Sequence, residues 1–162
     1  MKKILLLMFL EMAVFTLSIC AQGGAGNIAT GGTGNTPTGG TMKVKIMVGN
    51  TTLTATLLDN ATSLAFFAKL PLTVKMDDLY NREMCYHFPD ALPTDNVPTT
   101  GYEVGEIIYW PLRHSLVIMY AQNGERFSMQ KIGRIDSGVE IFRSTGDANV
   151  TFEVDTTSLR FD

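Results

Sequence analysis

Apolar and polar side chains alternate along the chain in short runs that begin at Met42. In residues 43–48 every second side chain is apolar, which is the period of a β-strand with one buried face. Residues 52–57 alternate in the same way, and the turn dipeptide Gly49-Asn50 separates the two runs. The pattern therefore predicts an antiparallel hairpin with one face in water.

A short helix is predicted next, over residues 62–70. Either Asp59 or Asn60 can cap it, because the side-chain oxygen of such a residue accepts a hydrogen bond from a free backbone N–H. Pro71 ends the helix, and residues 72–76 resume as a strand. The side chains expected to face the core are Leu64, Phe67 and Ala68.

Five further strands are predicted, and residues 89–105 are expected to form a proline-containing loop. The run 115–120 is apolar enough to predict a strand that is covered on both faces. Asn123-Gly124 is the best hairpin-turn signal in the chain, so residues 125–133 are expected to return as a strand beside that run. The five strands are expected at residues 84–88, 106–110, 115–120, 125–133 and 149–154.

The string KIGRIDSGVEIF, residues 131–142, is the most distinctive in the chain. It indicates a strand end, a tight turn and the start of a second short helix, which Asp136 or Ser137 would cap. The whole pattern gives about eight short strands and two short helices. Such spacing is typical of a mainly β protein with a closed β-barrel, and not of βαβ units.

The first 21 of the 162 residues have the pattern of a signal peptide. Lys2 and Lys3 precede an apolar run that only Glu11 interrupts, and the small residue Ala21 favours cleavage before Gln22. A cytosolic amphipathic helix is the alternative. We therefore expect an exported protein, located in the periplasm, in the cell envelope or outside the cell.

The two cysteines have different contexts. Cys20 closes the string Leu-Ser-Ile-Cys, which resembles a bacterial lipoprotein box, so a lipid anchor at Cys20 is the alternative to cleavage after Ala21. After such cleavage Cys85 would be alone, without a partner for an intramolecular disulfide. We expect it to be a small buried apolar residue, with no metal or redox role.

Residues 22–41 are rich in glycine and threonine and predict a flexible linker before a barrel domain at 42–155 and a short tail at 156–162. The net charge is −3, and removal of residues 1–21 makes it −4. A mildly acidic chain without a basic cluster excludes nucleic acid as the expected partner. Beyond the leader, no apolar run reaches the roughly 18 residues of a membrane span.

The order of elements resembles the cyclophilin-like barrel. Gly133-Arg134-Ile135-Asp136-Ser137-Gly138 matches the Gly-x-Val-x-x-Gly pattern that leads into the second helix of cyclophilins. Small bacterial proteins called cyclophilin-like fold proteins are more similar, over about 113 of the 162 residues. The similar strings are Met-Lys-Val-Lys-Ile from Met42, Asp59-Asn60, Leu70-Pro71-Leu72-Thr73 and Gly133-Arg134-Ile135-Asp136. The resemblance implies a closed barrel of about eight strands with two short helices.

The resemblance does not extend to the motif of prolyl isomerases. In true cyclophilins an arginine in a Phe-His-Arg string weakens the resonance of the X–Pro amide. Here Cys85-Tyr86-His87-Phe88-Pro89 contains no arginine, and Gln122-Asn123-Gly124-Glu125 stands out of order. Loss of a guanidinium removes a large electrostatic contribution to catalysis, so we do not expect efficient isomerase activity. Neither metal-ligand spacing nor GxSxG occurs, and no cofactor or metal is expected.

Aromatic residues around the irregular segment are the candidates for ligand binding, because exposed aromatics beside a long loop often mark a binding surface. Arg134 could orient an anion. The alternative is that most of these side chains fill the core. The candidate residues are Tyr86, His87, Phe88, Tyr109, Trp110 and Arg134.

We therefore expect an exported domain that binds a peptide or small ligand in a barrel-side cleft without catalysis. The alternatives are a weak or atypical prolyl isomerase and a structural accessory protein of the envelope.

Overall fold

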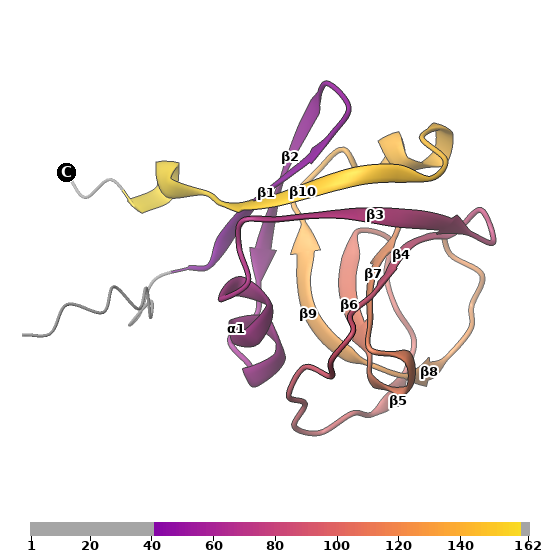
Figure 1. The fold of residues 1–162 in the computed structure, drawn as a ribbon. Coiled ribbons are helices and arrows are strands. Elements are labelled where there is room, and N and C mark those ends of the chain that lie inside the picture. The colour runs from indigo at the N-terminus through magenta and orange to yellow at the C-terminus, as the bar shows by residue number, and fades with distance from the viewer. Residues whose placement is uncertain (1–40, 160–162) are drawn as a thin grey trace, which may run out of the picture. The chain divides into compact units, whose positions relative to one another are not determined.

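The computed structural model describes residues 41–159 (Figure 1). The predicted leader, Cys20 and nearly all of the predicted linker lie outside these residues. The described chain contains one α-helix, α1 (Ala61–Phe67), and three 3-10 helices. The 3-10 helices are η1 (Pro111–Arg113), η2 (Val139–Ser144) and η3 (Thr156–Leu159). The strands are β1 (Lys43–Val48), β2 (Thr51–Leu57), β3 (Leu72–Leu79), β4 (Glu83–His87), β5 (Thr99–Thr100), β6 (Glu106–Trp110), β7 (Ser115–Met119), β8 (Phe127–Ser128), β9 (Gln130–Ile135) and β10 (Ala148–Val154).

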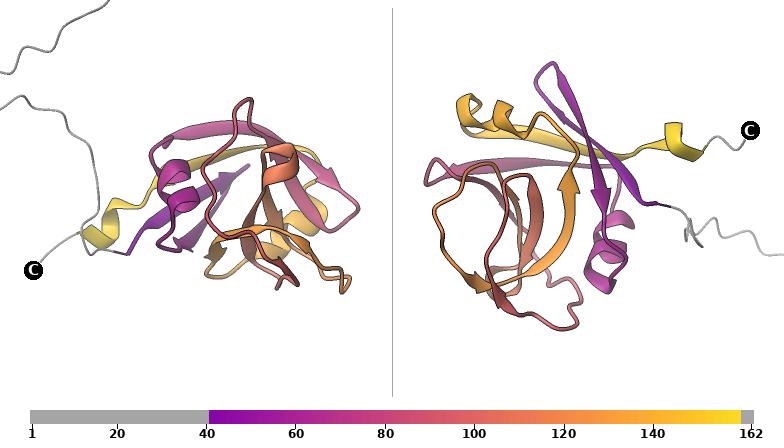
Figure 2. Two further views of the ribbon diagram at one scale, coloured as in Figure 1. Left: turned by 90° about the horizontal axis from the view of Figure 1, so that it is seen from below. Right: turned by 180° about the vertical axis from the view of Figure 1, so that it is seen from behind.

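Eight of these strands form the predicted closed barrel, in the order β1-β10-β3-β4-β7-β6-β9-β2, and all its pairs are antiparallel (Figure 2). β5 and β8 form a separate two-stranded sheet. The junctions β2–β9 and β3–β4 register only three residue pairs each, whereas the other six register four or more. The two short junctions lie on opposite sides of the ring.

The alternating runs place apolar side chains inside the barrel as predicted. Val44, Ile46 and Val48 of β1 are at most 5% exposed, and the residues between them are partly exposed. Phe66 of α1 packs edge to face on Phe152 of β10, with ring centroids 5.4 Å apart. The helix lies beside the lower end of β2 and β9 in the view from behind (Figure 2).

The helix α1 is shorter than predicted and turns a different face to the core. Asn60 caps it, because its side-chain oxygen accepts a 2.9 Å bond from the backbone N–H of Ser63. The hydroxyl of Ser63 donates to the carbonyl oxygen of Ile132 at 2.9 Å, and this bond draws the polar face inward. The prediction that Leu64 and Ala68 face the core is therefore wrong, since both are exposed.

Strand β7 is buried along its whole length, as the apolar run 115–120 predicted. Leu116 and Ile118 face the barrel interior. Val117 and Met119 face outward, where they pack in a second apolar cluster with Tyr102 and other residues of the β5–β8 region. Cys85 belongs to this outer cluster and is 4% exposed, which confirms that it is a buried apolar residue.

The hairpin predicted at Asn123-Gly124 is wrong. β7 pairs with β4 and β6, and residues 121–126 carry no ladder that would return the chain beside β7. The chain instead crosses outside the barrel as a segment of residues 121–127, which we call the strap; its last residue, Phe127, begins β8, and β9 follows. The reason is tertiary, because the hydroxyl of Tyr102 donates to the side-chain oxygen of Asn123 at 2.9 Å.

The string at residues 131–142 forms the end of β9, a turn and η2, in the predicted order. The predicted cap is wrong, because Gly138 occupies the N-cap position and no side chain bonds there. The carboxylate of Asp136 instead bonds to three residues of the first hairpin. It accepts hydrogen bonds from Lys43 (2.8 Å), Thr54 (3.0 Å) and Thr56 (2.8 Å). Asp136 thus ties β9 to the hairpin across the short β2–β9 junction.

Between residues 41 and 159 there is no helix with the length and apolar character of a membrane span.

Candidate functional site

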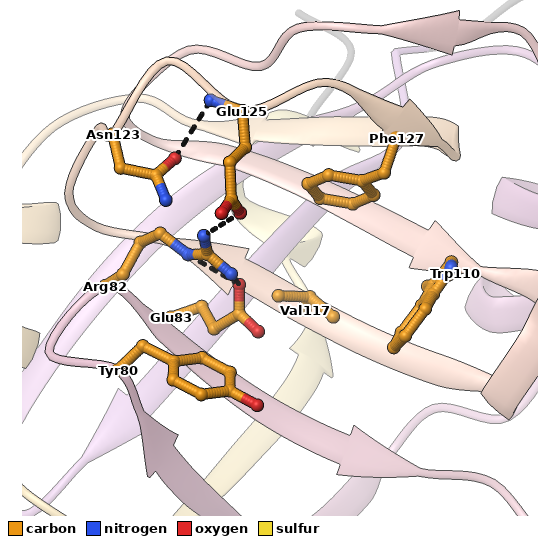
Figure 3. A pocket seen from close by; sticks show the side chains of 8 residues that line it. All are labelled: Tyr80, Arg82, Glu83, Trp110, Val117, Asn123, Glu125 and Phe127. Carbon is orange, nitrogen blue, oxygen red and sulfur yellow. Dashed lines mark hydrogen bonds and ion pairs between the residues drawn. The ribbon is translucent and has the colours of Figure 1, made fainter.

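A pocket of about 430 Å³ lies on the outer side of the barrel, over β4, β7 and the end of β6 (Figure 3). We call it the outer pocket. One wall comes from the turn between β3 and β4, and the opposite wall comes from the strap. Its lining residues are Tyr80, Arg82, Glu83, Trp110, Val117, Asn123, Glu125 and Phe127.

The β3–β4 turn presents Tyr80 at the mouth of the pocket. The backbone of Tyr80 and Asn81 is left-handed, with φ of 58° and 49°, and the N–H of Arg82 donates to the carbonyl oxygen of Leu79 at 3.1 Å. Two central residues of this conformation suit a tight hairpin, but the conformation is unfavourable for a bulky residue such as tyrosine. The Tyr80 side chain is 78% exposed, so the turn displays an aromatic ring to solvent.

The strap is held by its own side chains and by Tyr102. The side-chain oxygen of Gln122 accepts hydrogen bonds from the backbone N–H groups of Asn123 (2.9 Å) and Gly124 (2.8 Å). Asn123 accepts a 3.0 Å bond from the backbone N–H of Glu125. These bonds fix the backbone that carries Glu125 and Phe127 toward the pocket (Figure 3).

The charged base of the outer pocket is an ion-pair triad of Arg82, Glu83 and Glu125. The Nε and Nη2 atoms of Arg82 lie 3.0 Å and 2.8 Å from Oε2 of Glu83, and Nη1 pairs with Glu125. The arginine side chain is 12% exposed, and its guanidinium lies 5.4 Å from the centre of the Tyr80 ring. Arg82 is therefore engaged by two carboxylates and by the rings of Tyr80 and Tyr102.

Glu83 is the buried carboxylate of the triad, with a residue exposure of 8%. Burial raises the pKa of the Glu83 carboxyl above its ordinary value, and the charge and hydrogen bonds of Arg82 offset this only in part. Glu125 differs, because the pKa of this exposed carboxyl is lowered by hydrogen bonding at Asn123 and Arg82. The two carboxylates of one pocket therefore have opposite pKa shifts.

The far end of the outer pocket is apolar and aromatic. The rings of Trp110 and Phe127 meet at an interplanar angle of 66°, with centroids 6.3 Å apart, and Val117 of β7 lies between them and the triad (Figure 3). Both rings are half-buried, so each is supported by the barrel and still presents surface to the pocket. The site can therefore hold a flat or apolar group beside a charged one.

The six candidate residues from the sequence are not brought together. Trp110 lines the outer pocket, whereas Tyr109 is fully buried and its hydroxyl accepts a 2.9 Å bond from the N–H of Leu92. Arg134 is exposed on β9 and donates to the carbonyl oxygen of Val104 at 3.1 Å.

The other three candidates occupy β4 and the residue after it. Phe88 is 6% exposed in the core and packs edge to face with the half-buried Tyr86, at 5.1 Å between centroids. His87 is exposed, and its Nδ1 lies 2.8 Å from the hydroxyl oxygen of Ser115. None of these three lines the outer pocket.

Sequence reasoning missed most of the pocket. Arg82 and Glu83 are adjacent in the chain, but Glu125 joins them from 43 residues away, through the strap. A left-handed Tyr80 also has no signal in the sequence. The one available hint was Arg82-Glu83 directly before a strand, and it is too common to indicate a site.

The comparisons with known proteins agree on the fold. Residues 46–153 match the family model described as the Cyclophilin-like family. A comparison with the curated proteins gives no match. Among solved structures, the solution structure of a hypothetical protein from Archaeoglobus fulgidus is similar, with a TM-score of 0.58 and 16% sequence identity. That likeness covers 71% of this chain and 95% of the archaeal chain, and at this identity it shows the fold alone.

Proposed function

This chain belongs to the cyclophilin-like family, and we propose that it is exported and that its barrel binds a peptide or a small ligand in the outer pocket without catalysis. The observation that carries the proposal is the pocket itself. Its volume of about 430 Å³ is within the range typical of small-ligand sites, and it joins an aromatic end to a few charged groups.

The pocket contains an arginine, but the setting of Arg82 argues against isomerase chemistry. An isomerase guanidinium must act on the X–Pro amide as the bond twists, and it supplies a large electrostatic contribution there. The Arg82 guanidinium donates to Glu83 and pairs with Glu125, and the two carboxylates outweigh its charge. Binding without turnover therefore fits the pocket better than catalysis.

Trp110 supplies the assay for ligand binding, because it is the only tryptophan of the chain and it lines the pocket. A library of short peptides and small molecules would be screened by thermal shift, and hits would be titrated against Trp110 fluorescence. A ligand at 100 times its Kd should stabilise the protein by about 2.7 kcal/mol. We expect at least one hit in which the two signals agree.

Two exposed apolar residues make a matched pair of variants. Tyr80 lines the pocket and is 78% exposed, whereas Leu112 is 81% exposed and does not line it. Tyr80→Ala should weaken binding of a hit, and Leu112→Ala should leave it unchanged. No hit at all, or equal losses in both variants, would contradict the proposal and favour the barrel as a structural scaffold.

The enzymatic alternative is tested with a proline peptide in a cis–trans isomerisation assay beside a true cyclophilin. We expect no acceleration by this protein. An isomerase would be established instead if the protein accelerated the reaction and the acceleration were lost in Arg82→Ala but kept in Arg134→Ala. Arg134 is the control because it lies on β9, outside the pocket.

Export rests on the sequence of residues 1–21. Mass spectrometry of the protein from fractionated cells should give a mature chain that begins at Gln22. A diacylated product that begins at Cys20 would establish the lipid anchor, and an uncleaved cytosolic chain would contradict export.

A further inference from the structure

The charges that line the outer pocket favour a positively charged ligand. Arg82, Glu83 and Glu125 are its charged lining residues, so two glutamates face one arginine and the pocket is left with one excess negative charge. An anionic ligand would have to displace Glu125 from Arg82 and would still meet the charge of Glu83. A cation meets neither obstacle.

Arg82 is already occupied. Its three guanidinium nitrogens are engaged by Glu83 and Glu125, and its Cζ atom lies 5.4 Å from the ring centre of Tyr80 and 6.0 Å from that of Tyr102. Since its side chain is only 12% exposed, it presents little surface to an incoming group. The side chain of Glu83 is just as buried, at 11% exposure, whereas the side chain of Glu125 is 61% exposed and accessible.

Glu83 supplies the acceptor that points into the pocket. Its Oε2 atom takes both contacts with Arg82, and among residues 41–159 no hydrogen bond uses Oε1. Figure 3 shows that the second carboxylate oxygen points away from Arg82, toward the space between Tyr80 and Val117. A residue that is 8% exposed thus directs an unused carboxylate oxygen into a cavity. Such a group gains from a partner, because burial of an incompletely compensated charge is costly.

The remaining walls suit an organic cation better than a metal ion. Trp110, Phe127 and Tyr80 offer ring faces, which attract cations and cover apolar groups. Ca²⁺ needs six or more oxygen ligands, and Mg²⁺ needs a near-octahedral set. Within the described part of the chain, no three His, Cys, Asp or Glu side chains are placed to hold a metal ion.

We propose that the outer pocket binds an organic cation, with a protonated amine or a guanidinium at Glu83 and an apolar body against Trp110 and Phe127. This inference rests on the proposed function, because it names the ligand class of the same pocket. The cation can come from a basic side chain of a peptide or from a free small amine, since the pocket meets the same chemistry in both.

The test uses the full chain and three probes of one shape, namely 4-phenylbutylamine, 4-phenylbutan-1-ol and 4-phenylbutyrate. Each is titrated against Trp110 fluorescence. The amine should bind at least about tenfold more tightly than the alcohol, and the carboxylate more weakly than the alcohol. The preference for the amine should fall as salt is raised, because the charge at the exposed Glu125 is screened.

Two variants test whether the preference for the amine comes from the glutamates of the pocket. Glu125→Gln, at a side chain that is 61% exposed, and Glu83→Gln should each reduce the preference for the amine while the affinity for the alcohol is kept. Circular dichroism checks the fold of Glu83→Gln, and Glu125→Gln carries the test if that variant fails to fold. The matched control is Glu140→Gln, at an exposed glutamate of η2 that is outside the pocket, and it should change neither affinity.

The failures of the two proposals are distinguishable. Three results would overturn the cation inference and still leave a pocket that binds ligands. The amine and the alcohol could bind equally, the carboxylate could bind more tightly than the alcohol, or the preference for the amine could survive both Glu125→Gln and a folded Glu83→Gln. If none of the three probes binds, the cation inference is also overturned, and the library screen decides separately whether the pocket binds anything.

A blocked dipeptide of phenylalanine and lysine separates the two sources of the cation. Tighter binding of the dipeptide than of 4-phenylbutylamine supports the inference with a peptide as the ligand. Tighter binding of the amine supports it with a small molecule.

Discussion

Gly133→Ala tests whether the middle of β9 has room for any side chain. A Cβ atom placed on Gly133 would lie 2.7 Å from Cδ2 of Leu57 and 2.8 Å from the backbone oxygen of Thr56. Carbon atoms in contact normally lie about 3.5–4.0 Å apart, so something must shift. Leu57 is 5% exposed and pairs directly with Gly133, so neither its side chain nor the β2 backbone can move freely.

The magnitude follows from two opposing effects. Overpacking that forces a backbone shift costs up to about 3 kcal/mol. Replacement of glycine by alanine recovers about 1 kcal/mol through the smaller entropy of the unfolded chain. The free energy of unfolding should therefore fall by about 2 kcal/mol, which corresponds to a loss of about 8 °C in Tm for a domain of this size.

The assay is urea unfolding followed by circular dichroism and by Trp110 fluorescence. Gly101→Ala is the matched control, because a Cβ on Gly101 has no atom within 4 Å and its φ is not left-handed. The control should unfold at the same or a slightly higher urea concentration than the wild type. If Gly133→Ala unfolds at the midpoint of Gly101→Ala, the close contact between β9 and β2 is refuted.

Three other side chains give tests of their own. Partial burial acts to raise the pKa of Asp136, but hydrogen bonds from Lys43 and two threonines prevail and lower it. The carboxylate therefore stabilises the folded protein above the ordinary pKa of 3.8, and this stabilisation is lost as the pH falls. Asp136→Asn should therefore lower the free energy of unfolding by about 1 kcal/mol at neutral pH. In urea titrations the difference in unfolding free energy between the variant and the wild type should narrow below pH 3.8, and a difference that stays constant would contradict this. The pH dependence expected for Glu83 runs the other way, because its pKa is raised and its contribution to the free energy of unfolding is complete below the ordinary value of 4.5. The stability of the wild type relative to Glu83→Gln should therefore fall as the pH rises above 4.5. A rise would count against the buried carboxylate. Burial raises the pKa of the Cys85 thiol to about 11, so Cys85 should react with a thiol reagent only after urea unfolding, and rapid reaction in the folded protein would show that the outer cluster is open.

Contacts between neighbours in the chain are where the sequence was informative. The hairpin of β1 and β2 has side chains that alternate with its own register, and Asn60 caps a helix that begins at the next residue. The apolar run at β7 likewise predicted burial on both faces. In each case the interaction that determines the structure lies within a few residues, so a local pattern can express it.

Contacts between distant segments explain the failures. Asn123-Gly124 has the composition of a hairpin turn, but the Tyr102 hydroxyl and the pairing of Glu125 with Arg82 hold that segment across the outside of the barrel. The outer pocket exists only because of this crossing. Of the candidate residues, Trp110, a large aromatic at a strand end, lines the pocket, whereas the triad that faces it is assembled from separate parts of the chain.

The two short junctions, β2–β9 and β3–β4, give the barrel two weak seams. They divide the eight strands into two sheets of four, β2-β1-β10-β3 and β4-β7-β6-β9. Amide hydrogens at these seams should exchange with solvent through openings of lower free energy than those inside either sheet, so that the sheets behave as two cooperative units. Tyr80 lies in the turn that crosses one seam, and Trp110 belongs to the second sheet. A ligand held between these two rings would bridge that seam, and slower exchange at β3 and β4 would then record its binding without any change in the fold.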